Sequence, residues 1–271
     1  MTFREAIAKL GETGIENAKN EAALLFFEIE KKDGMWVREN PDVDLDSTEL
    51  ENAIKRRISR EPLQHILGKW YFYREEYKVS RDCLIPRADS EMIVDYAIKN
   101  LPRGARFLDL CTGSGCLAIS TLASRPDCSA VAVDISEAAL ALARENARHN
   151  SVDGRIEFIC ADILNDLLQD IGSFDAIISN PPYIPTDDLA SLSPELSFEP
   201  RIALDGGDDG LIFYKRILKD LSPLLKVGGR FIFEIGYDQA DSLRKLNSSA
   251  KVYKDLGKND RMVIINKLNG D

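Results

Sequence analysis

The sequence predicts an α/β protein, in which a mostly parallel sheet carries helices on both faces and follows a smaller helical domain. Two observations carry this prediction. From residue 106 onward, short apolar runs that suit buried strands alternate with helical stretches, the pattern of a parallel sheet covered on both faces. Before them, the first 65 or so residues place apolar side chains at spacings of three and four, as amphipathic helices do.

The N-terminal segment is expected to fold as helices over residues 1–65. The helical spacing occurs in FREAIAKL, in EAALLFFEIEKK and in TELENAIKRRISR, which follows the turn and cap residues of NPDVDLDS. The stretch WYFYREEYKVS (70–80) is rich in aromatic residues and predicts a short hairpin. We therefore assign 1–65 to a helical domain, 66–86 to a hairpin linker and 87–271 to a second domain.

The second domain is expected to hold a seven-stranded sheet. Its parallel strands are predicted at RFLDL (106–110), AVAVDI (130–135), IEFICAD (156–162), FDAIISN (174–180) and GRFIFEIG (229–236). Helical stretches, such as SEAALALARENARHN, lie between most of these runs. The last two runs, KVYKDL and RMVIINKL, are separated only by a short polar loop, which predicts an antiparallel hairpin.

Composition and charge argue against several classes of protein. The net charge of −10 and a pI of about 4.9 give no global positive field that would attract nucleic acid. The basic cluster Lys55-Arg56-Arg57 with Arg60 is expected to be a solvated helix face. Five cysteines without a CxxC pair, and only two histidines, argue against a zinc cluster. No apolar run approaches the roughly 20 residues of a membrane span. Together with the cysteine and histidine content, this leads us to expect a reduced, cytoplasmic protein without a metal.

A glycine-rich turn follows the first predicted strand. Gly113-Ser114-Gly115-Cys116-Leu117-Ala118 fits the pattern G-x-G-x-x-A, which is found where strand-to-helix turns bind dinucleotides. Glycines there let the backbone approach a ligand closely, and the amides at a helix N-terminus favour anionic groups. Taken alone, this match predicts a binding site and a purely structural tight turn about equally.

Acidic residues end the next two predicted strands. Asp134 lies 19 positions beyond Gly115 (134 − 115) and could accept hydrogen bonds from ribose hydroxyls, or cap the helix that begins near Ser136. Asp162 ends the third strand, where it could accept from an adenine amino group or cap ILNDLL. Both interpretations stay open for each residue when it is considered alone.

The fourth strand runs into Ser-Asn-Pro-Pro-Tyr-Ile-Pro (179–185), which by itself suits a stiff turn. However, the glycine turn, Asp134, Asp162 and Asn180 all fall at carboxyl ends of successive strands, the edge where open α/β sheets bind ligands. A nicotinamide enzyme has no evident use for Asn-Pro-Pro-Tyr there, whereas S-adenosylmethionine needs an adenosine pocket beside a site for a nucleophile. The Asn180 oxygen and the Pro181 carbonyl could accept both N–H bonds of a planar –NH2 group, with Tyr183 packed against it.

The motifs together resemble a known family. FLDLCTGSGCLAIS, AVAVDIS, FICADIL and FDAIISNPPYIP resemble, in order, the motifs of Rossmann-like class I methyltransferases. EPLQHILG, LIPRADSE, FEPRIALDGGDDGL, LKVGGRFIFEIG and KDLGKNDR, with the helical start, resemble the HemK/PrmC protein methyltransferases over essentially the whole chain. Enzymes of that family methylate the side-chain amide nitrogen of the glutamine in the Gly-Gly-Gln motif of peptide chain release factors.

The resemblance implies S-adenosylmethionine as cofactor, a release factor as protein substrate, and an N-terminal domain that helps to recognise it. The implied cofactor-binding residues are Cys111, Thr112, Gly113, Ser114, Gly115, Asp134 at the ribose, Asp162 at the adenine, and Asn180. The implied substrate-binding residues are Asn180, Pro181, Pro182 and Tyr183, of which Asn180, Pro181 and Tyr183 would be catalytic. We expect a monomer that binds neither nucleic acid nor a membrane.

Two departures from the family pattern and three alternatives accompany this interpretation. Cys111 stands where a glycine is usual, and would be strained if its φ is positive; Ala88-Asp89-Ser90-Glu91 replaces the usual Pro-Glu-Thr-Glu.

The alternatives are a glutamine methyltransferase of a ribosomal protein, an N6-adenine methyltransferase of nucleic acid, and an inactive binding module. The acidic chain argues against the nucleic-acid enzyme, and the intact run from Asn180 to Tyr183 argues against the inactive module.

Overall fold

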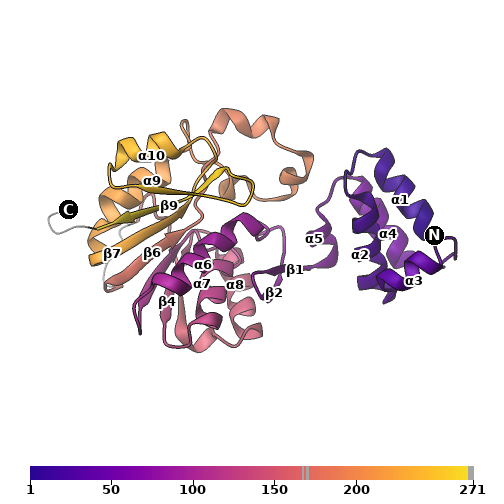
Figure 1. The fold of residues 1–271 in the computed structure, drawn as a ribbon, viewed down its shortest axis with the longest axis horizontal. Coiled ribbons are helices and arrows are strands. Elements are labelled where there is room, and N and C mark those ends of the chain that lie inside the picture. The colour runs from indigo at the N-terminus through magenta and orange to yellow at the C-terminus, as the bar shows by residue number, and fades with distance from the viewer. Residues whose placement is uncertain (167, 169–170, 268–271) are drawn as a thin grey trace. The chain divides into compact units, whose positions relative to one another are not determined.

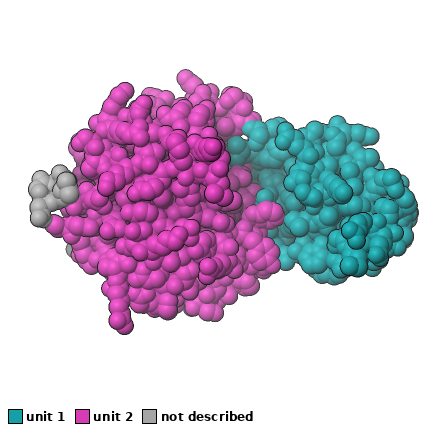
Figure 2. Space-filling view, in the orientation of Figure 1, with its two compact units in different colours: residues 1–69, 193–198 teal, residues 70–192, 199–271 magenta. Residues whose placement is uncertain are grey.

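The computed structural model describes residues 1–166, 168 and 171–267, and the chain divides into two compact units (Figures 1 and 2). Unit 1 comprises residues 1–69 together with the distant segment 193–198. Unit 2 comprises residues 70–192 and 199–271. Unit 1 is therefore made from two separate stretches of the sequence.

Unit 1 consists of short helices around an apolar core, as the helical spacing predicts. Its α-helices are α1 (Phe3–Glu12), α2 (Ala18–Glu30), α3 (Gly34–Glu39), α4 (Thr48–Ile58) and α5 (Leu63–Leu67). Thr2 begins α1 in a capping box with Glu5, and the Ser47 hydroxyl accepts from the backbone N–H of Leu50 to cap α4. The fully buried core side chains come from α1, α2 and α4 and include Leu10, Leu25, Phe26, Leu50 and Ile54.

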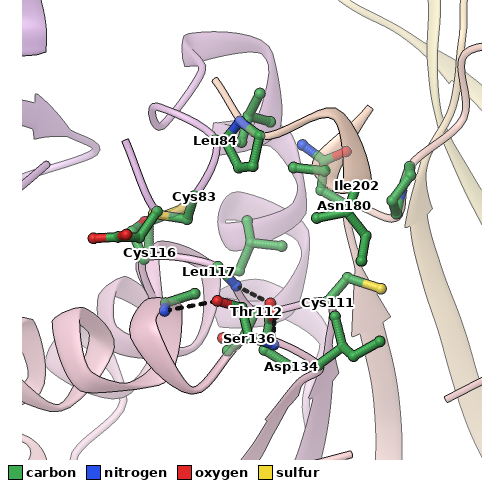
Figure 3. Close-up of a pocket in the computed structure, with 18 of the residues that line it drawn as sticks. Cys83, Leu84, Cys111, Thr112, Cys116, Leu117, Asp134, Ser136, Asn180 and Ile202 are labelled. Atoms are coloured by element: carbon green, nitrogen blue, oxygen red, sulfur yellow. Dashed lines mark hydrogen bonds between the residues drawn. The ribbon is translucent and has the colours of Figure 1, made fainter. Parts of the chain in front are cut away.

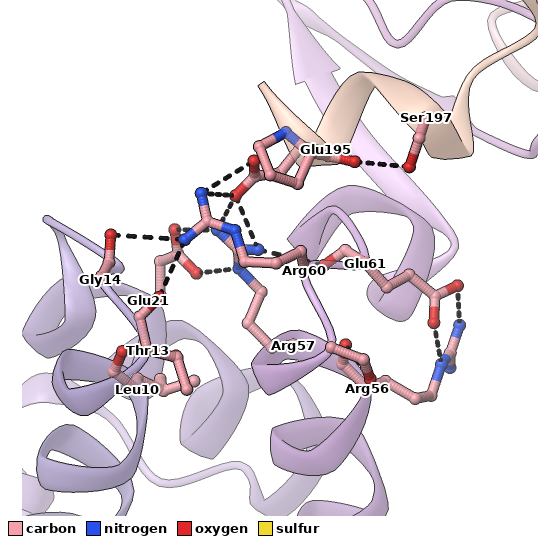
Figure 4. Close-up of polar contacts among 12 residues, drawn as sticks. Leu10, Thr13, Gly14, Glu21, Arg56, Arg57, Arg60, Glu61, Glu195 and Ser197 are labelled. Carbon is pink, nitrogen blue, oxygen red and sulfur yellow. Dashed lines mark hydrogen bonds and ion pairs between the residues drawn. The ribbon is translucent and has the colours of Figure 1, made fainter. Parts of the chain in front are cut away.

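The basic cluster Lys55-Arg56-Arg57 with Arg60 is only partly the solvated face that its sequence suggests (Figure 4). The side chains of Lys55 and Arg56 are 70% and 47% exposed. Arg57 is only 6% exposed, because its guanidinium lies between Glu21 of α2 and Glu195 of the returning segment. Arg60 also pairs with Glu195, at 2.7 Å, and Arg56 pairs with Glu61. For Arg57 and Arg60 the prediction was wrong, because their acidic partner Glu195 lies 138 positions from Arg57 in the sequence.

Unit 2 is built on a seven-stranded sheet in the order β5-β4-β3-β6-β7-β9-β8, which confirms the predicted α/β fold. The strands are β3 (Arg106–Leu110), β4 (Ser129–Asp134), β5 (Ile156–Cys160), β6 (Phe174–Ser179), β7 (Leu225–Glu234), β8 (Lys251–Lys254) and β9 (Asp260–Asn266). The first five are parallel, whereas β9 pairs antiparallel with both β7 and β8. A separate two-stranded sheet is formed by β1 (Lys69–Phe72) and β2 (Glu75–Lys78).

Side chains that alternate along the strands build one apolar core on each face of the sheet. In β3, Phe107 belongs to one core, and Leu108 and Leu110 belong to the other. The first core includes α6 (Glu91–Asn100), α7 (Cys116–Ser124) and α8 (Glu137–His149); the second includes α9 (Ile212–Arg216) and α10 (Ala240–Leu246). Shorter helical turns are η1 (Ala88–Ser90), η2 (Asp153–Arg155), η3 (Thr186–Ser191), η4 (Pro194–Phe198), η5 (Arg201–Ala203), η6 (Ile217–Leu221) and η7 (Ser222–Leu224).

The sheet topology sets the position of the site. Because β3, β4, β5, β6 and β7 are parallel neighbours, the loops that follow them all leave at one edge of the sheet. The loops after β3, β4, β5 and β6 carry the residues that the sequence marked out. Within the described part of the chain, every helix is too short or too polar to cross a lipid bilayer.

Candidate active site

A cavity lies in unit 2 over the carboxyl ends of β3, β4, β5 and β6 (Figure 3). Its walls are mainly apolar and come from the segment before α6 and from the loops after the strands. The apolar lining residues include Leu84, Ile85, Ile135, Ile163, Leu164 and Ile202. Apolar walls with a few convergent polar groups are the usual composition of a small-molecule site.

The turn after β3 holds its backbone in the left-handed region at three positions. The φ angles are 57° at Cys111, 55° at Gly113 and 81° at Gly115. Glycine adopts this region freely, whereas Cys111 is strained there, as its place in a glycine position suggests. A Cβ at Gly115 would also crowd its neighbours, since it would lie 2.8 Å from the end of the Ile119 side chain and 3.2 Å from Ala143 Cβ.

Asp109 of β3, which the sequence did not mark as a site residue, holds this turn through hydrogen bonds. Its carboxylate is fully buried and accepts hydrogen bonds from the Thr112 hydroxyl at 2.6 Å and the Ala118 amide at 3.3 Å. Burial raises the pKa of Asp109 to about 7, although both hydrogen bonds act to lower it. The two hydrogen bonds therefore fix the conformation of the turn, and the carboxyl group that accepts them is removed from water.

Asp134 connects the glycine turn to the loop after β4. One carboxylate oxygen accepts from the Gly113 amide at 2.8 Å, and the other accepts from the Ser136 amide at 2.9 Å. Burial raises the pKa of Asp134 and the bonded amides lower it. The cap of α8 is Ser136 itself, whose hydroxyl accepts from the Ala139 amide at 3.2 Å. Asp134 is therefore not the residue that caps α8, and it lines the cavity.

Asp162 makes local contacts and also lines the cavity. Its carboxylate accepts from the Leu164 amide at 2.9 Å and from the Asn165 side chain at 2.6 Å. These bonds close a turn after β5, where residues 163–166 form no helix, so Asp162 is not the helix cap that the sequence left open. Asp162 is among the residues that line the cavity.

Asn180 lies at the end of β6 with its amide nitrogen bonded to Ser90. The Asn180 Nδ2–H donates to Ser90 Oγ at 3.0 Å, and Asn180 and Pro182 line the cavity. Tyr183 points its hydroxyl elsewhere and donates to Glu234 Oε1 at 3.2 Å. Burial and the nearby Glu234 carboxylate raise the pKa of the Tyr183 hydroxyl, which is therefore un-ionised at neutral pH.

The structure brings most of the predicted site residues to this one cavity. The predicted residues that line it are Cys111, Thr112, Gly113, Ser114, Asp134, Asp162, Asn180 and Pro182. Gly115, Pro181 and Tyr183 are adjacent in sequence to lining residues but are not part of the lining. Gly115 contributes through backbone conformation and close packing, and Tyr183 through its bond to Glu234.

A second glycine-rich segment holds the Asn180–Ile184 turn in place. The Ile184 amide donates to Leu204 O at 3.0 Å, and the Gly206 amide donates back to Ile184 O at 2.8 Å. A Cβ at Gly206 would lie 2.8 Å from Tyr183 Cα, and one at Gly210 would lie 2.3 Å from Tyr183 O. This close approach gives a physical reason for the glycines in the sequence ALDGGDDGL.

The site also includes four residues that the sequence analysis missed: Arg87, Ser90, Glu199 and Glu234. Glu199 accepts from the Ile85 amide at 2.8 Å and pairs with Arg87, which holds the cavity wall before α6. Glu234 is 2% exposed at the end of β7 and bonds to both Ser90 and Tyr183. In the sequence they lie inside LIPRADSE, FEPRIALDGG and FIFEIG, and nothing in these runs connects the four residues with one another.

Comparison with known proteins identifies both parts of the chain. Residues 2–68 match the PrmC N-terminal domain, and residues 90–192 match the methyltransferase small domain. Among solved structures, a methyltransferase from Pyrococcus furiosus superposes with a TM-score of 0.52 at 18% identity, over 71% of this chain and 88% of that one. The hMettl16 catalytic domain gives 0.56 at 17% identity, over 72% and 76%. At these identities the likeness concerns the fold alone.

Sequence relatives are closer. Release factor glutamine methyltransferases share 40% identity with this chain in Caulobacter vibrioides, over 79% of the chain and 76% of the relative, and 40% in Geobacter sulfurreducens, over 86% and 82%. The relative of that name from Cereibacter sphaeroides is 35% identical over 96% of this chain and 95% of its own length. The chain belongs to the release factor glutamine methyltransferase family.

Proposed function

We propose that this protein transfers a methyl group from S-adenosylmethionine to the side-chain amide nitrogen of the glutamine in the Gly-Gly-Gln motif of a peptide chain release factor. The observation that carries the proposal is the position of Asn180. Its amide is held by Ser90 at the end of β6, in the same cavity as Asp134 and the glycine turn. The names of the relatives supply the class of substrate.

The residues of the cavity fit the cofactor. Asp134 offers carboxylate oxygens as acceptors for ribose hydroxyls, and Asp162, which lines the same cavity, offers acceptors for an adenine amino group. The apolar side chains of Ile135 and Ile163 suit a flat heterocycle. A Cβ at Gly113 would lie 3.6 Å from Cys83, an ordinary van der Waals distance, so the glycine is needed there for its φ of 55°.

The turn residues Cys111, Thr112, Gly113 and Ser114 would hold the cofactor from the β3 side. When bound, S-adenosylmethionine supplies an electrophilic methyl group on a positively charged sulfur. Burial raises the pKa of the Cys111 thiol well above its usual range, so this side chain stays neutral beside the cofactor.

The protein's own contribution is to orient the substrate nitrogen. An amide nitrogen is a poor nucleophile because its lone pair is delocalised into the carbonyl group. Asn180 Oδ1 and the Pro181 carbonyl accept the two N–H bonds of the substrate amide, which aligns the nitrogen and stabilises the positive charge that develops on it. Pro182 holds the backbone direction of the turn, and Tyr183 packs against the substrate amide and excludes water.

We assign recognition of the release factor to unit 1, within which residues 1–65 provide the helices. The cavity lining comes wholly from unit 2, so unit 1 has no part in the chemistry that we describe. One copy of the chain contains every residue named here, and we propose that it acts as a monomer. All five cysteines are free thiols, which suits the cytoplasm, where release factors act.

The test is methyl transfer from radiolabelled S-adenosylmethionine by the Asn180→Ala variant. Loss of one preorganised acceptor should lower turnover on an intact release factor by about 10²–10³-fold, by analogy with a lost oxyanion-hole donor. The affinity for S-adenosylhomocysteine, measured by calorimetric titration, should change little. Asn100→Ala is the matched control, because among the described residues the Asn100 side chain bonds only to Tyr96 O, at the end of α6.

Parallel assays on a release factor, a ribosomal protein and DNA separate the alternatives. Methyl transfer by the unaltered protein to the ribosomal protein or to DNA, and not to the factor, would replace the proposed substrate. No transfer to any of them would favour an inactive binding module. Near-normal turnover by Asn180→Ala would remove Asn180 from the mechanism.

A further inference from the structure

Behind Asn180, a chain of hydrogen bonds runs into the protein interior and ends at a buried carboxylate. Asn180 Nδ2–H donates to Ser90 Oγ at 3.0 Å, and the Ser90 hydroxyl donates to Glu234 Oε2. Ser90 and Glu234 are each 2% exposed. They come from different elements, since Ser90 ends η1 and Glu234 ends β7. No role described so far requires a hydroxyl and a carboxylate at these buried positions.

The order of donors and acceptors in this chain follows from the ionised carboxylate. A carboxylate can only accept, so the single proton of the Ser90 hydroxyl is directed to Glu234. The Ser90 oxygen must then accept from its other neighbour, which has to present the NH2 side of the Asn180 amide. The Asn180 oxygen is left without a hydrogen-bond partner among the described residues, and Asn180 is one of the residues that line the cavity.

We propose that Ser90 and Glu234 are positioning residues for methyl transfer, which orient the Asn180 amide so that its oxygen and not its nitrogen meets the substrate. The inference rests on the proposed function, because it assigns the oxygen of Asn180 as the acceptor for the substrate amide. A rotated Asn180 would present N–H donors to the N–H bonds of the substrate. A donor facing a donor would repel the group that has to be bound.

The protonation state of Glu234 controls this orientation. The charged and titratable groups that face it are Asp89 and Ser90 from η1, Tyr183 from the loop after β6, Tyr214 from α9, Cys116 from α7 and Arg261 from β9. Burial raises the pKa of Glu234 to about 7, while the Ser90 bond, Arg261 and Tyr183 act to lower it. A protonated Glu234 can donate to Ser90, which can then donate to the Asn180 oxygen and stabilise the rotated amide.

The first test replaces Ser90 and measures turnover separately from binding. Ser90→Ala should lower kcat on the release factor roughly 2- to 12-fold, the size of one lost hydrogen bond, with an unchanged affinity for S-adenosylhomocysteine. Ser90→Thr keeps the hydroxyl and should restore most of the rate. In the Asn180→Ala background, Ser90→Ala should have no further effect on kcat, because the group that it orients is gone.

The matched control is Ser120→Ala in α7. Ser120 is also a buried serine whose hydroxyl donates to a glutamate, Glu75, at 2.6 Å, but it is not part of the cavity lining. This variant should lose stability without losing kcat. If Ser90→Ala keeps the normal kcat while Asn180→Ala is impaired, the positioning role is wrong and the proposed function stands. If Asn180→Ala is also unimpaired, the proposed function itself fails.

The second test is the pH dependence of kcat. Since ionised Glu234 gives the productive orientation, kcat of the unaltered protein should rise with pH through about 7. Glu234→Gln always carries an NH2 group that can donate to Ser90, so its kcat should be low and should lack this rise. A rise near pH 7 that persists in Glu234→Gln would assign the titration to another group and overturn the role of Glu234.

Discussion

At the scale of single residues, Cys111 shows how the site tolerates strain. Its φ of 57° lies in the region that costs a residue with a Cβ roughly 1–2 kcal/mol. The side chain lines the cavity and also packs against the core that contains Leu108 and Leu110. Its packing therefore offsets part of the strain that a glycine at this position would avoid.

The strain at Cys111 can be measured by comparing two substitutions. Both Cys111→Ala and Cys111→Gly remove the sulfur, but only the glycine relieves the left-handed backbone. We expect Cys111→Gly to be more stable than Cys111→Ala by about 1 kcal/mol in urea unfolding. Cys128, which is buried and has no positive φ, is the control, and there alanine should be the more stable substitution. The same order of stability at both positions would mean that Cys111 is not strained.

The residues of the site differ in how far the sequence reveals them. Asp134, Asp162 and Asn180 could be predicted because each directly follows an apolar strand, and parallel strands bring their carboxyl ends to one edge. Ser90 and Glu234 could not, because neither has a distinctive neighbourhood and they are 144 positions apart. Their chemistry arises only when η1 and β7 are brought together by the folded sheet.

At the scale of elements, the turn after β6 depends on the glycine-rich segment that follows η5. Gly206 has an ordinary φ, so an alanine there acts by its Cβ alone. That Cβ would lie 2.8 Å from Tyr183 Cα and 2.9 Å from both Pro182 O and Gly210 Cα. Backbone atoms cannot move aside as a flexible side chain can, so the turn itself must shift.

Gly206→Ala should therefore reduce both stability and turnover. We expect a loss of about 1–3 kcal/mol in the free energy of unfolding, the usual cost of overpacking, and a lower kcat because the shifted turn carries Asn180. Gly154→Ala in η2 is the control, since its Cβ would meet nothing within 4 Å. Chemical denaturation and methyl-transfer assays check both variants. Equal stability of the two would show that the turn accommodates the extra methyl group.

The elements that the sequence predicts are those with a strong local pattern. The strands and the antiparallel pair β8 and β9 follow from apolar runs and a short polar loop. The helix α3 and the 3₁₀ turns η3, η4 and η5 escaped prediction, because they are short and lack a repeating apolar spacing. β7 begins at Leu225, before the apolar run at 229–236, because Leu225 already pairs with Phe174 of β6. The register between the two strands then shifts, and regular pairing resumes at Arg230.

At the scale of the whole molecule, unit 1 relies on charges that are buried within it. Arg57 Nε lies 2.5 Å from Glu21 Oε2, and Arg57 Nη1 lies 3.2 Å from Glu195 Oε1 (Figure 4). Arg57 also donates to Glu61 O at 3.3 Å. Removing one partner of such a network leaves carboxylates that are partly desolvated and uncompensated.

Arg57→Met keeps most of the side-chain volume and removes the charge. We expect it to lower the stability of unit 1 by about 3–5 kcal/mol and to increase hydrogen exchange in residues 193–198, while cofactor binding in unit 2 is retained. Arg4→Met is the control, because the Arg4–Asp42 pair is exposed on both sides and its loss should change little. Equal effects of the two substitutions on unfolding would show that the buried network contributes no more than a surface pair.

The discontinuous make-up of unit 1 constrains how its gene can recombine. The chain crosses the boundary between the units after residue 69, after residue 192 and after residue 198. A chimera that exchanged only the first 69 residues between relatives would inherit Arg57 and Glu21 from one parent and Glu195 from the other. We expect chimeras that exchange unit 1 between relatives to fold when residues 193–198 come from the same parent as residues 1–69. The two distant parts of the gene should therefore be under selection as a single unit.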